Sequence, residues 1–410
     1  MMYRVVVTGM DGICPIGNNW DSILENLRIG RNGVQHMQNW ECYKDLNTRL
    51  AAPVKGFDKP AHYSRKQVRS MGRVALMSTA VTEKALLDAG LLGDPQITDG
   101  RMGVSYGSST GSTDAIADFG HMLINYASST INANSYLKMM SHTSAVNIGV
   151  FFGLKGRIIP SSSACTSGSQ GLGYAYEAIK YGHQKLMVAG GAEELCATEA
   201  AVFDTLYATS TKNDTPHLTP RPYDKDRDGL VIGEGACTLI LEEREHALQR
   251  GAKIYAEIVG FGTNSDGSHV TQPQADTMYK AMSLAMAQSG LKTSDIGYVS
   301  GHGTATGRGD IAETIATERL LGKVPISSFK SYTGHTLGAC GALEAMVAIK
   351  MMRLGWFHGT ANLDNIDSEC AELDYLIGAG RDINTDHVMS NNFAFGGINT
   401  SLIFRNGSKD

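Results

Sequence analysis

The sequence predicts an α/β fold made of two halves, and two observations lead to this prediction. Short β-rich runs that end in glycine alternate with longer segments of helical period, an order that is typical of α/β proteins. The 410 residues exceed the usual size of one domain, so we expect either two domains or one large fold with two halves. The 47 glycines indicate many tight turns and close backbone approaches, which suits sites built from loops.

The elements follow from the hydrophobic pattern. Strands are predicted at residues 4–8, 102–106, 185–189, 254–260, 296–300 and 400–404. Helices, with apolar residues at three- and four-residue steps, are predicted at residues 73–89, 168–180, 277–289, 311–321 and 339–353. A charged helical stretch at 242–252 separates two regions that each restart with a strand, so the predicted halves are residues 1–252 and 253–410. We interpret the polar residues 108–142 as a long, variable insertion, with an oligomer contact as one use for it.

The composition argues against several function classes. The formal net charge of −5 gives no reason to expect nucleic acid or an anionic membrane as a partner. No apolar run reaches the ~20 residues that a membrane span needs, and no charged leader with an apolar stretch precedes the first strand. The seven cysteines are scattered, without a CxxC pair or a Cys/His metal spacing. We therefore expect a soluble, cytoplasmic protein with free thiols and no metal.

Cys165 is the candidate nucleophile. It lies where a predicted strand ends and a helix with small residues begins, in the run Ser161-Ser-Ser-Ala-Cys-Thr-Ser-Gly168. A thiol at a helix N-terminus lies near the positive end of the helix dipole and near free backbone N–H groups, which favour the attacking thiolate. A buried structural role is the usual one for cysteine and is the interpretation for four others: Cys14, Cys196, Cys237 and Cys340.

Two histidines lie in similar loops. His302 follows the strand at 296–300, and His335 follows another apolar run and precedes a helix. A lone loop histidine is usually a surface or hydrogen-bonded residue, but two of them with a cysteine suit acyl transfer followed by decarboxylation. The reason is that neutral imidazole N–H groups can donate to the enolate oxygen that develops as carbon dioxide leaves. Metal binding is the weaker interpretation, because a third ligand at a recognisable spacing is missing.

An aromatic residue beside two glycines precedes the last predicted strand. The run is Asn391-Asn-Phe-Ala-Phe-Gly-Gly-Ile-Asn399. Glycine permits positive φ and a close approach of backbone N–H groups to a bound carbonyl oxygen. Two interpretations stay open: a movable aromatic gate with an oxyanion-hole N–H, and a plain hairpin turn over the core.

Four motifs together resemble those of the β-ketoacyl-acyl carrier protein synthases of the Cys–His–His type, most closely the bacterial ketoacyl synthase II class. They are SACTSG from Ser163, GHGTATGRGD from Gly301, KSYTGHTLGACGALEA from Lys330 and NNFAFGGIN from Asn391. The resemblance spans nearly the whole chain. It implies a thiolase-like fold, in which two similar halves form a five-layered α-β-α-β-α core.

The resemblance also implies roles for the matching residues. Cys165 would carry the acyl chain, and His302 and His335 would promote decarboxylation of a malonyl thioester. The backbone N–H groups of Cys165 and Phe395 would form the oxyanion hole, with Phe395 as the gate, and Lys330 would support His335 electrostatically. Glu344 and Asp310 would support the site from outside it. Substrate contacts are implied for Thr304, Thr306, Phe393, Gly396 and Thr110.

Several positions depart from the family's pattern. Gly307 and Arg308 stand where a proline and a small residue are usual, and Ala394 replaces the glycine before the gating phenylalanine. Thr110 stands where a larger aliphatic residue often lines the acyl pocket. Alanine allows fewer backbone conformations than glycine, so these positions leave gate motion and chain-length preference open.

The resemblance implies partners as well. A basic cluster matches the region where the family docks its acidic carrier protein, although a solvated helix face is the other interpretation. The cluster consists of Arg65, Lys66, Arg69 and Arg73. The implied assembly is a homodimer, with a heterodimer containing a ketosynthase-like partner as the alternative. The implied chemistry needs no cofactor beyond the phosphopantetheine of acyl carrier protein.

The predicted function is therefore the decarboxylative Claisen condensation that elongates fatty acids. A specialised polyene- or polyketide-type ketosynthase is the alternative. A non-catalytic partner subunit is less favoured because such subunits usually lack the active-site cysteine. A thiolase is less favoured because it uses a second cysteine in a C-terminal Cys-x-Gly turn, where this chain has Phe-Ala-Phe-Gly-Gly.

Overall fold

The two halves of the chain repeat one arrangement of strands. The computed structural model describes residues 2–407. In the first half the strand order is β1-β8-β6-β4-β5, with bounds Val5–Ile13, Gly235–Glu243, Leu186–Glu193, Met102–Gly107 and Ile158–Pro160. In the second half the order is β9-β16-β15-β10-β11-β13, with bounds Ala256–Ser265, Ile398–Asn406, His387–Ala394, Tyr298–Ser300, Pro325–Ser327 and Asp374–Tyr375.

The pairing directions show the repeat. In each half the first two pairs of strands are antiparallel and the next two are parallel. A short antiparallel contact between β1 and β9 joins the halves into one eleven-stranded sheet. The chain crosses from one half to the other through α9 (Arg244–Gln249), between β8 and β9.

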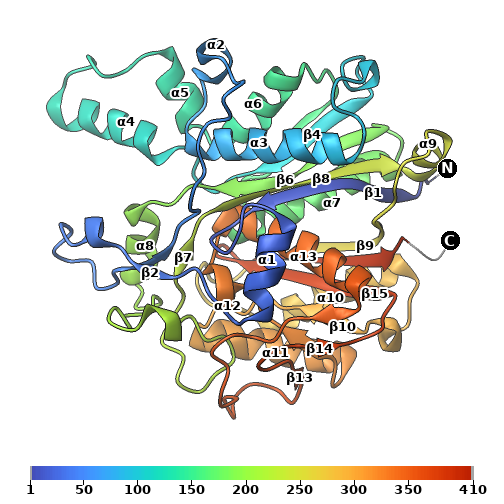
Figure 1. The fold of residues 1–410 in the computed structure, drawn as a ribbon. Helices are drawn as coiled ribbons and strands as arrows, with labels where there is room; N and C mark the ends of the chain where they lie inside the picture. The colour runs from blue at the N-terminus through green and yellow to red at the C-terminus, as the bar shows by residue number, and fades with distance from the viewer. Residues whose placement is uncertain (1, 408–410) are drawn as a thin grey trace.

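Helices form the other three layers (Figure 1). The middle layer consists of α7 (Ser167–Lys180) and α13 (Cys340–Leu354), which pack against each other and against strands of both halves. The outer layers are α3 (Arg73–Asp88) with α6 (Thr143–Phe152) over the first half, and α10 (Ala275–Ser289) with α11 (Gly307–Leu321) over the second. The fold is the predicted α/β, five-layered α-β-α-β-α arrangement.

Shorter elements cover the ends of these layers. They are α1 (Trp20–Arg28), β2 (Gln35–His36), β3 (Leu50–Ala52), α2 (Arg65–Val68), α8 (Ala197–Asp204), β7 (Ile232–Gly233), α12 (Lys330–Thr333), β12 (Trp356–Phe357) and β14 (Arg381–Asp382). Among residues 2–407, no helix combines the length and the apolar character needed to cross a bilayer.

Two strands continue through glycines at which the sequence indicated an end. β6 runs to Glu193 because Gly191 is a contact point: a Cβ there would lie 2.1 Å from the Gly338 carbonyl oxygen and 2.8 Å from Gly168 Cα. β1 runs past Gly9, where a Cβ would lie 2.4 Å from the Ala85 carbonyl oxygen on α3. These glycines serve close packing between a strand and a helix layer, and not a turn.

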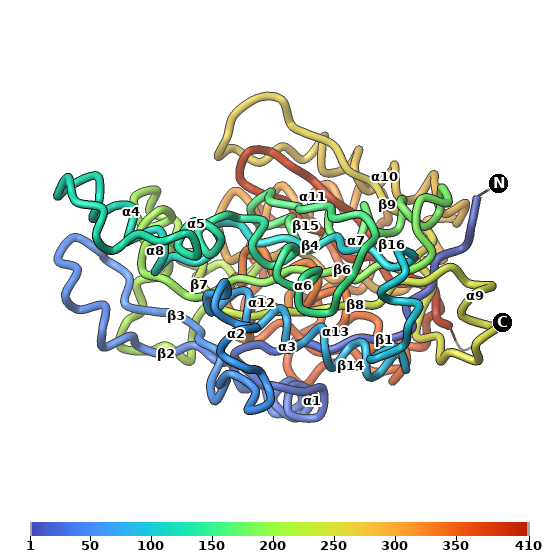
Figure 2. Tube along the Cα trace, turned by 90° about the horizontal axis from the view of Figure 1, so that it is seen from above, coloured from blue at the N-terminus to red at the C-terminus, as the bar shows by residue number. Residues whose placement is uncertain are grey.

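Residues 108–142 contain two helices that the sequence analysis did not assign. They are α4 (Thr113–Asn125) and α5 (Ala133–Met139), and they project from the side of the molecule (Figure 2). Their large apolar side chains include Leu123, Ile124 and Tyr126, which are 72%, 75% and 94% exposed. These apolar side chains are not buried within the chain.

Candidate active site

Cys165 lies in a tight turn at the start of the buried helix α7. The turn is a short 3-10 segment, Ala164–Thr166, in which Ala164 has a φ of 49°. The two histidine loops contain similar left-handed residues, Ala305 (φ 65°) and Leu337 (φ 42°). Non-glycine residues adopt this conformation only where the surrounding structure imposes it, and such strain gathers at functional sites.

His335 contacts the sulfur of Cys165 directly. Its Nε2 lies 2.9 Å from Cys165 Sγ, and the backbone N–H of Leu337 donates to its Nδ1 at 3.3 Å. Because Nδ1 accepts this bond, the proton of the neutral ring is on Nε2. His335 therefore presents an N–H donor to the sulfur.

His302 faces the same cavity in the same tautomer. Its Nδ1 lies 3.1 Å from Lys330 Nζ, and since an ammonium group can only donate, the proton of His302 is also on Nε2. The rings of His302 and His335 are nearly perpendicular, with centroids 5.3 Å apart. Glu313 fixes the loop by accepting the backbone N–H groups of His302 at 2.5 Å and of Gly303 at 2.7 Å.

Burial keeps both imidazoles neutral. It lowers the pKa of His302 and of His335 well below the ordinary value, and the nearby charge of Lys330 lowers both pKa values further. A neutral ring with its proton on Nε2 can donate to a developing oxyanion without first losing a proton. The cavity thus holds two such donors beside one thiol.

In the resting Cys165 side chain, burial outweighs the effect of the helix N-terminus, which we expected to favour the thiolate. Burial raises the pKa of the Cys165 thiol to about 11, although the charge of Lys330 and the backbone N–H groups of Phe395 and Cys165 act in the opposite direction. The expectation considered the helix N-terminus alone. It omitted the loss of solvent around a side chain that is 3% exposed.

Lys330 and Glu344 form an ion pair behind the histidines. Lys330 Nζ lies 2.5 Å from Glu344 Oε1, and each side chain is 1% exposed. Burial lowers the pKa of Lys330, but the charge of Glu344, the hydrogen bond to it and the neighbouring Cys340 and Glu313 together more than offset this effect, so the ammonium stays charged. The ammonium contacts His302, and it acts on His335 through its charge, which is the electrostatic influence that the resemblance implied.

The glycine-rich run is a hairpin turn that also lines the cavity. It joins the antiparallel strands β15 and β16, and Gly396 and Gly397 have φ of 88° and 72°, which glycine adopts at little cost. The ring of Phe395 lines the cavity and packs on Phe203 of α8, with ring centroids 4.9 Å apart. Movement of Phe395 as a gate stays a prediction.

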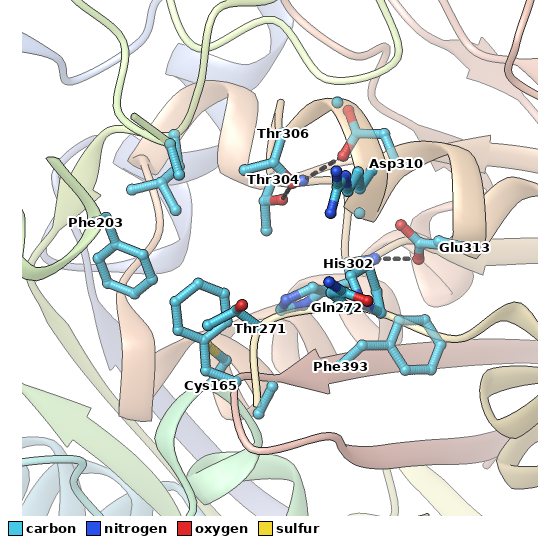
Figure 3. A pocket seen from close by; sticks show the side chains of 18 of the residues that line it. Cys165, Phe203, Thr271, Gln272, His302, Thr304, Thr306, Asp310, Glu313 and Phe393 are labelled. Carbon is cyan, nitrogen blue, oxygen red and sulfur yellow. Dashed lines mark hydrogen bonds between the residues drawn. The ribbon is translucent and has the colours of Figure 1, made fainter. Parts of the chain in front are cut away.

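A cavity of about 670 Å³ connects these groups (Figure 3). Its wall includes Phe393 and the hydroxyls of Thr304 and Thr306, which lie 2.9 Å apart. Asp310 holds this loop by accepting the backbone N–H of Thr304 at 2.9 Å. The lining also includes exposed residues, among them Arg308, so the cavity opens to solvent.

Two predicted substrate contacts lie outside this cavity. Gly396 is exposed, and its neighbour Gly397 lines the cavity instead. The hydroxyl of Thr110 lies 3.3 Å from Glu199 Oε1 and 3.4 Å from Glu193 Oε1. Burial, and then the charge of Glu193, raise the pKa of Glu199 well above its ordinary value, so a neutral carboxyl group faces Thr110.

Sequence reasoning missed two buried carboxylates that hold the loops. Glu313 is one, and its position three residues after Asp310 places both carboxylates on one face at the start of α11, a spacing that could have indicated it. The other is Glu193, which accepts the backbone N–H groups of Ser109 at 2.8 Å and of Gly338 at 3.0 Å. No local pattern marks Glu193, because its partners are distant in the chain.

All four residues of the basic cluster are exposed, and one of them is also paired. Arg65 and Lys66 of α2, and Arg69 after it, are exposed to solvent. Arg73 also makes a bidentate ion pair with the buried Glu234, through Nε at 2.5 Å and Nη2 at 2.9 Å. Arg73 is thus both a surface residue, with 41% of its side chain exposed, and the partner of a buried carboxylate at the start of α3.

The thiol and the two imidazoles are close enough to hold a metal ion. Their ligand atoms all lie within 4.8 Å of one another. However, the Nδ1 atoms of His302 and His335 accept hydrogen bonds from Lys330 and from the Leu337 backbone, so each Nε2 carries a proton and has no lone pair to offer. The arrangement favours hydrogen-bond donation over metal binding.

Comparison with known proteins agrees with this geometry. The family model described as "Beta-ketoacyl synthase, N-terminal domain" matches residues 2–247, and that described as "Beta-ketoacyl synthase, C-terminal domain" matches residues 255–364. The protein named 3-oxoacyl-[acyl-carrier-protein] synthase 2 of Vibrio cholerae is 39% identical, over 98% of this chain and 99% of its own.

Solved structures give the same result. A β-ketoacyl synthase from Burkholderia phymatum STM815 is 59% identical and has a TM-score of 0.98, covering 99% of this chain and 100% of its own. The ishigamide ketosynthase/chain length factor is 28% identical with a TM-score of 0.91, at the same coverage. Full-length similarity, the paired family models and the Cys–His–His geometry lead to one conclusion: this chain belongs to the β-ketoacyl synthase family.

Proposed function

We propose that this chain condenses a Cys165-bound acyl chain with malonyl-acyl carrier protein, releasing carbon dioxide and β-ketoacyl-acyl carrier protein. The observation that carries the proposal is the contact of His335 Nε2 with Cys165 Sγ at 2.9 Å, beside a second neutral histidine, His302, in the same cavity. A thiol and two imidazole N–H donors are what acyl transfer followed by enolate formation needs. The name of the Vibrio cholerae relative supports acyl carrier protein as the carrier.

The first step is transfer of the acyl chain to Cys165. The backbone N–H groups of Cys165 and Phe395, which both face the sulfur, bind the thioester oxygen as negative charge develops on it. A bond forms between Cys165 Sγ and the carbonyl carbon, and the bond from that carbon to the carrier's sulfur breaks. The proton of the Cys165 thiol ends on the released carrier thiol, so the step is balanced without another reactant.

The second step is decarboxylation and carbon–carbon bond formation. The malonyl carboxylate leaves as carbon dioxide, and its electron pair forms an enolate whose oxygen accepts hydrogen bonds from Nε2 of His302 and of His335. The enolate carbon attacks the acyl carbon on Cys165 and breaks its bond to sulfur. The Cys165 thiolate then takes up one proton, which restores the resting thiol.

The remaining predicted residues have supporting roles in this proposal. Thr304 and Thr306 bind the pantetheine arm, Phe393 and the turn at Gly396 shape the cavity wall, and Phe395 opens for the acyl chain. The two threonine hydroxyls line the wall that Asp310 holds in place. The chemistry requires no redox change, so we propose that the enzyme needs no cofactor other than the carrier's phosphopantetheine.

We also propose a homodimer and a docked carrier protein. The exposed residues Arg65, Lys66 and Arg69 supply a basic surface for an acidic carrier. The exposed apolar side chains of α4 and α5, together with the edge strand β5, supply a surface that a second copy covers. The seven free thiols suit a reducing cytoplasm, where we place the reaction.

A second candidate is a ketosynthase for conjugated or oxygenated chains. The observation that favours it is the buried contact between Thr110 and the neutral carboxyl of Glu199, since Thr110 stands where the family often has an aliphatic residue. A hydroxyl and a carboxyl group can hydrogen-bond to a polar acyl chain, whereas a saturated chain offers them no hydrogen-bond partner. A ketosynthase of similar structure is the ishigamide ketosynthase/chain length factor.

The two candidates differ in the chains that Cys165 accepts. The purified protein is incubated with carrier proteins that bear saturated, unsaturated or conjugated chains, malonyl-carrier protein is added, and products and Cys165 acylation are followed by intact mass. We expect extension to be lost in Cys165→Ala and kept in the control Cys42→Ala, whose thiol is exposed. Extension of saturated chains supports fatty acid elongation, and acylation by conjugated chains alone supports the second candidate. No acylation by any chain would contradict both and indicate a non-catalytic partner subunit.

A further inference from the structure

Asn392 contacts the two groups that Lys330 also contacts. It lies in β15 and is 0% exposed. Its Nδ2 lies 2.6 Å from Glu344 Oε2 and 3.4 Å from His302 Nδ1. Lys330 Nζ donates to Glu344 Oε1 at 2.5 Å and to the same His302 Nδ1 at 3.1 Å. The amide and the ammonium therefore donate to the same two side chains.

The hydrogen-bonding groups of Glu344 and His302 determine which end of the Asn392 amide faces them. The carboxylate oxygen of Glu344 and the ring Nδ1 of His302 are both acceptors, and an amide oxygen 2.6 Å from a carboxylate oxygen would be repelled. The NH2 end therefore faces Glu344. Among the described residues Asn392 Oδ1 has no hydrogen-bond partner, and it lies against Gly341, where a Cβ would come within 2.8 Å of it. The glycine leaves room for the amide.

The amide stabilises the charges behind His302. Without Asn392 Nδ2, one oxygen of the buried Glu344 carboxylate would lose its donor, which is costly in a site without water. Burial raises the pKa of Glu344, and the bonds from Lys330 and Asn392 lower it. If Glu344 became neutral, Lys330 would lose its counter-charge and would tend to lose its proton. A neutral Lys330 amine could accept a hydrogen bond from an Nδ1–H group of His302, which would favour the tautomer with its proton on Nδ1 and remove the N–H donor from the cavity side.

We propose that Asn392 is a positioning residue that keeps the Nε2–H of His302 directed at the malonyl thioester. His335 is the histidine in contact with Cys165 Sγ, whereas the contacts of His302 lead to Lys330 and Asn392. Loss of the amide therefore impairs decarboxylation and spares the acylation of Cys165. The inference rests on the proposed function and assigns to it a residue that the sequence motifs did not indicate.

The test measures the two half-reactions separately. Acylation is the rate of Cys165 loading by acyl-carrier protein, followed by intact mass, and decarboxylation is carbon dioxide release from malonyl-carrier protein by pre-acylated enzyme. In Asn392→Leu we expect decarboxylation to fall about ten- to a hundredfold, while acylation changes by less than about threefold. The matched control is Asn391→Leu, because Asn391 is equally buried on the same strand but contacts Met282 Sδ at 3.2 Å instead. It should show no such split.

A second variant tests the donor itself. In Asn392→Asp the new carboxyl group stands beside Glu344, and two carboxyl groups this close share one proton. That proton restores a donor at low pH and is lost as the pH rises. Decarboxylation by this variant should therefore fall with rising pH over a range in which the wild-type rate is constant, while acylation follows the wild-type profile.

Two results would overturn the inference. One is an equal loss of both half-reactions in Asn392→Leu, which is the result of a purely structural role. The other is a decarboxylation profile of Asn392→Asp that runs parallel to that of the wild type. A wild-type protein that performs neither half-reaction would contradict the proposed function instead, so the two failures are distinguishable.

Discussion

The reactivity of Cys165 is set by two opposing effects on one sulfur atom. Burial raises the pKa of its thiol to about 11, and Lys330, with the backbone N–H groups of Phe395 and Cys165, lowers it. The same N–H groups are available to a thioester oxygen when substrate is bound. A thioester oxygen that accepts these hydrogen bonds makes its carbonyl carbon easier to attack, so the site activates the thioester and keeps the resting thiol protonated.

This account predicts the pH dependence of alkylation. Because the thiol is protonated below a pKa of about 11, the thiolate fraction of Cys165 grows about tenfold for each pH unit from 7 to 10. The rate of Cys165 modification by iodoacetamide should grow in the same proportion. It is measured by mass spectrometry of the peptide that contains Cys165, with the peptide that contains the exposed Cys42 as a control for reagent loss. A rate that levels off near neutral pH would contradict the prediction.

At the scale of elements, the basic residues of α2 and the basic residue at the start of α3 have different roles. The cations of α2 and of Arg69 after it point to solvent, whereas Arg73 at the start of α3 pairs with Glu234 and anchors the helix to the chain just before β8. Sequence proximity suggested one cluster. Arg73 differs from the other three residues because it lies close to the buried Glu234 carboxylate and forms an ion pair with it.

Charge reversal on α2 separates docking from chemistry. The double variant Lys66→Glu and Arg69→Glu should lower kcat/KM for acyl-carrier protein about tenfold at low salt, because an attractive surface becomes repulsive. The deficit should shrink at high salt, where the wild-type attraction is screened. Both are measured by steady-state kinetics over a range of salt concentration.

The controls are a different substrate and a different variant. An acyl-pantetheine thioester, which has no carrier protein, should be used equally well by the double variant and the wild type. Arg73→Gln should instead lower the midpoint of urea unfolding, because it leaves Glu234 buried and unpaired. A loss of activity with the small thioester that equals the loss with the carrier protein would exclude docking as the cause.

For the whole molecule, the two repeated halves form the core and the projecting helices α4 and α5 form a surface. Leu123, Ile124 and Tyr126 expose most of their apolar area at the end of α4, and Ile158 on the edge strand β5 is 44% exposed. An isolated chain would leave this apolar area in water. In the proposed homodimer a second copy would cover this area, which would account for apolar residues that have no role in the core of one chain.

This surface predicts a dimer that charged substitutions dissociate. Leu123→Asp with Ile124→Asp should convert a dimer into monomers at micromolar concentration, because two charges would be buried without partners in the interface. Sedimentation velocity measures the change. Leu87→Asp is the matched control, since Leu87 is 66% exposed on α3 and should leave the dimer intact. A wild-type monomer, or equal dissociation of the control, would contradict the prediction.

Local patterns were enough to find the main elements and the reacting residues. The helices at α3, α7, α10, α11 and α13 show their periodicity within 15 or so residues, and Cys165, His302 and His335 each lie in a short segment before a long helix. The five-layered arrangement came from the family resemblance of the motifs. The sequence also left α4 and α5 unassigned, because their apolar residues do not face this chain's own core.

Tertiary structure alone decided how the side chains are paired and protonated. Lys330 contacts His302 and not His335, Arg73 turns to Glu234, and Asn392 joins Glu344. These partners lie 28, 161 and 48 residues apart for the three pairs. The choice of partner in each pair and the protonated state of Cys165 both follow from burial, which removes water from around the side chains when the chain folds. Burial depends on which residues are close in space, and a pattern along the chain does not contain this information.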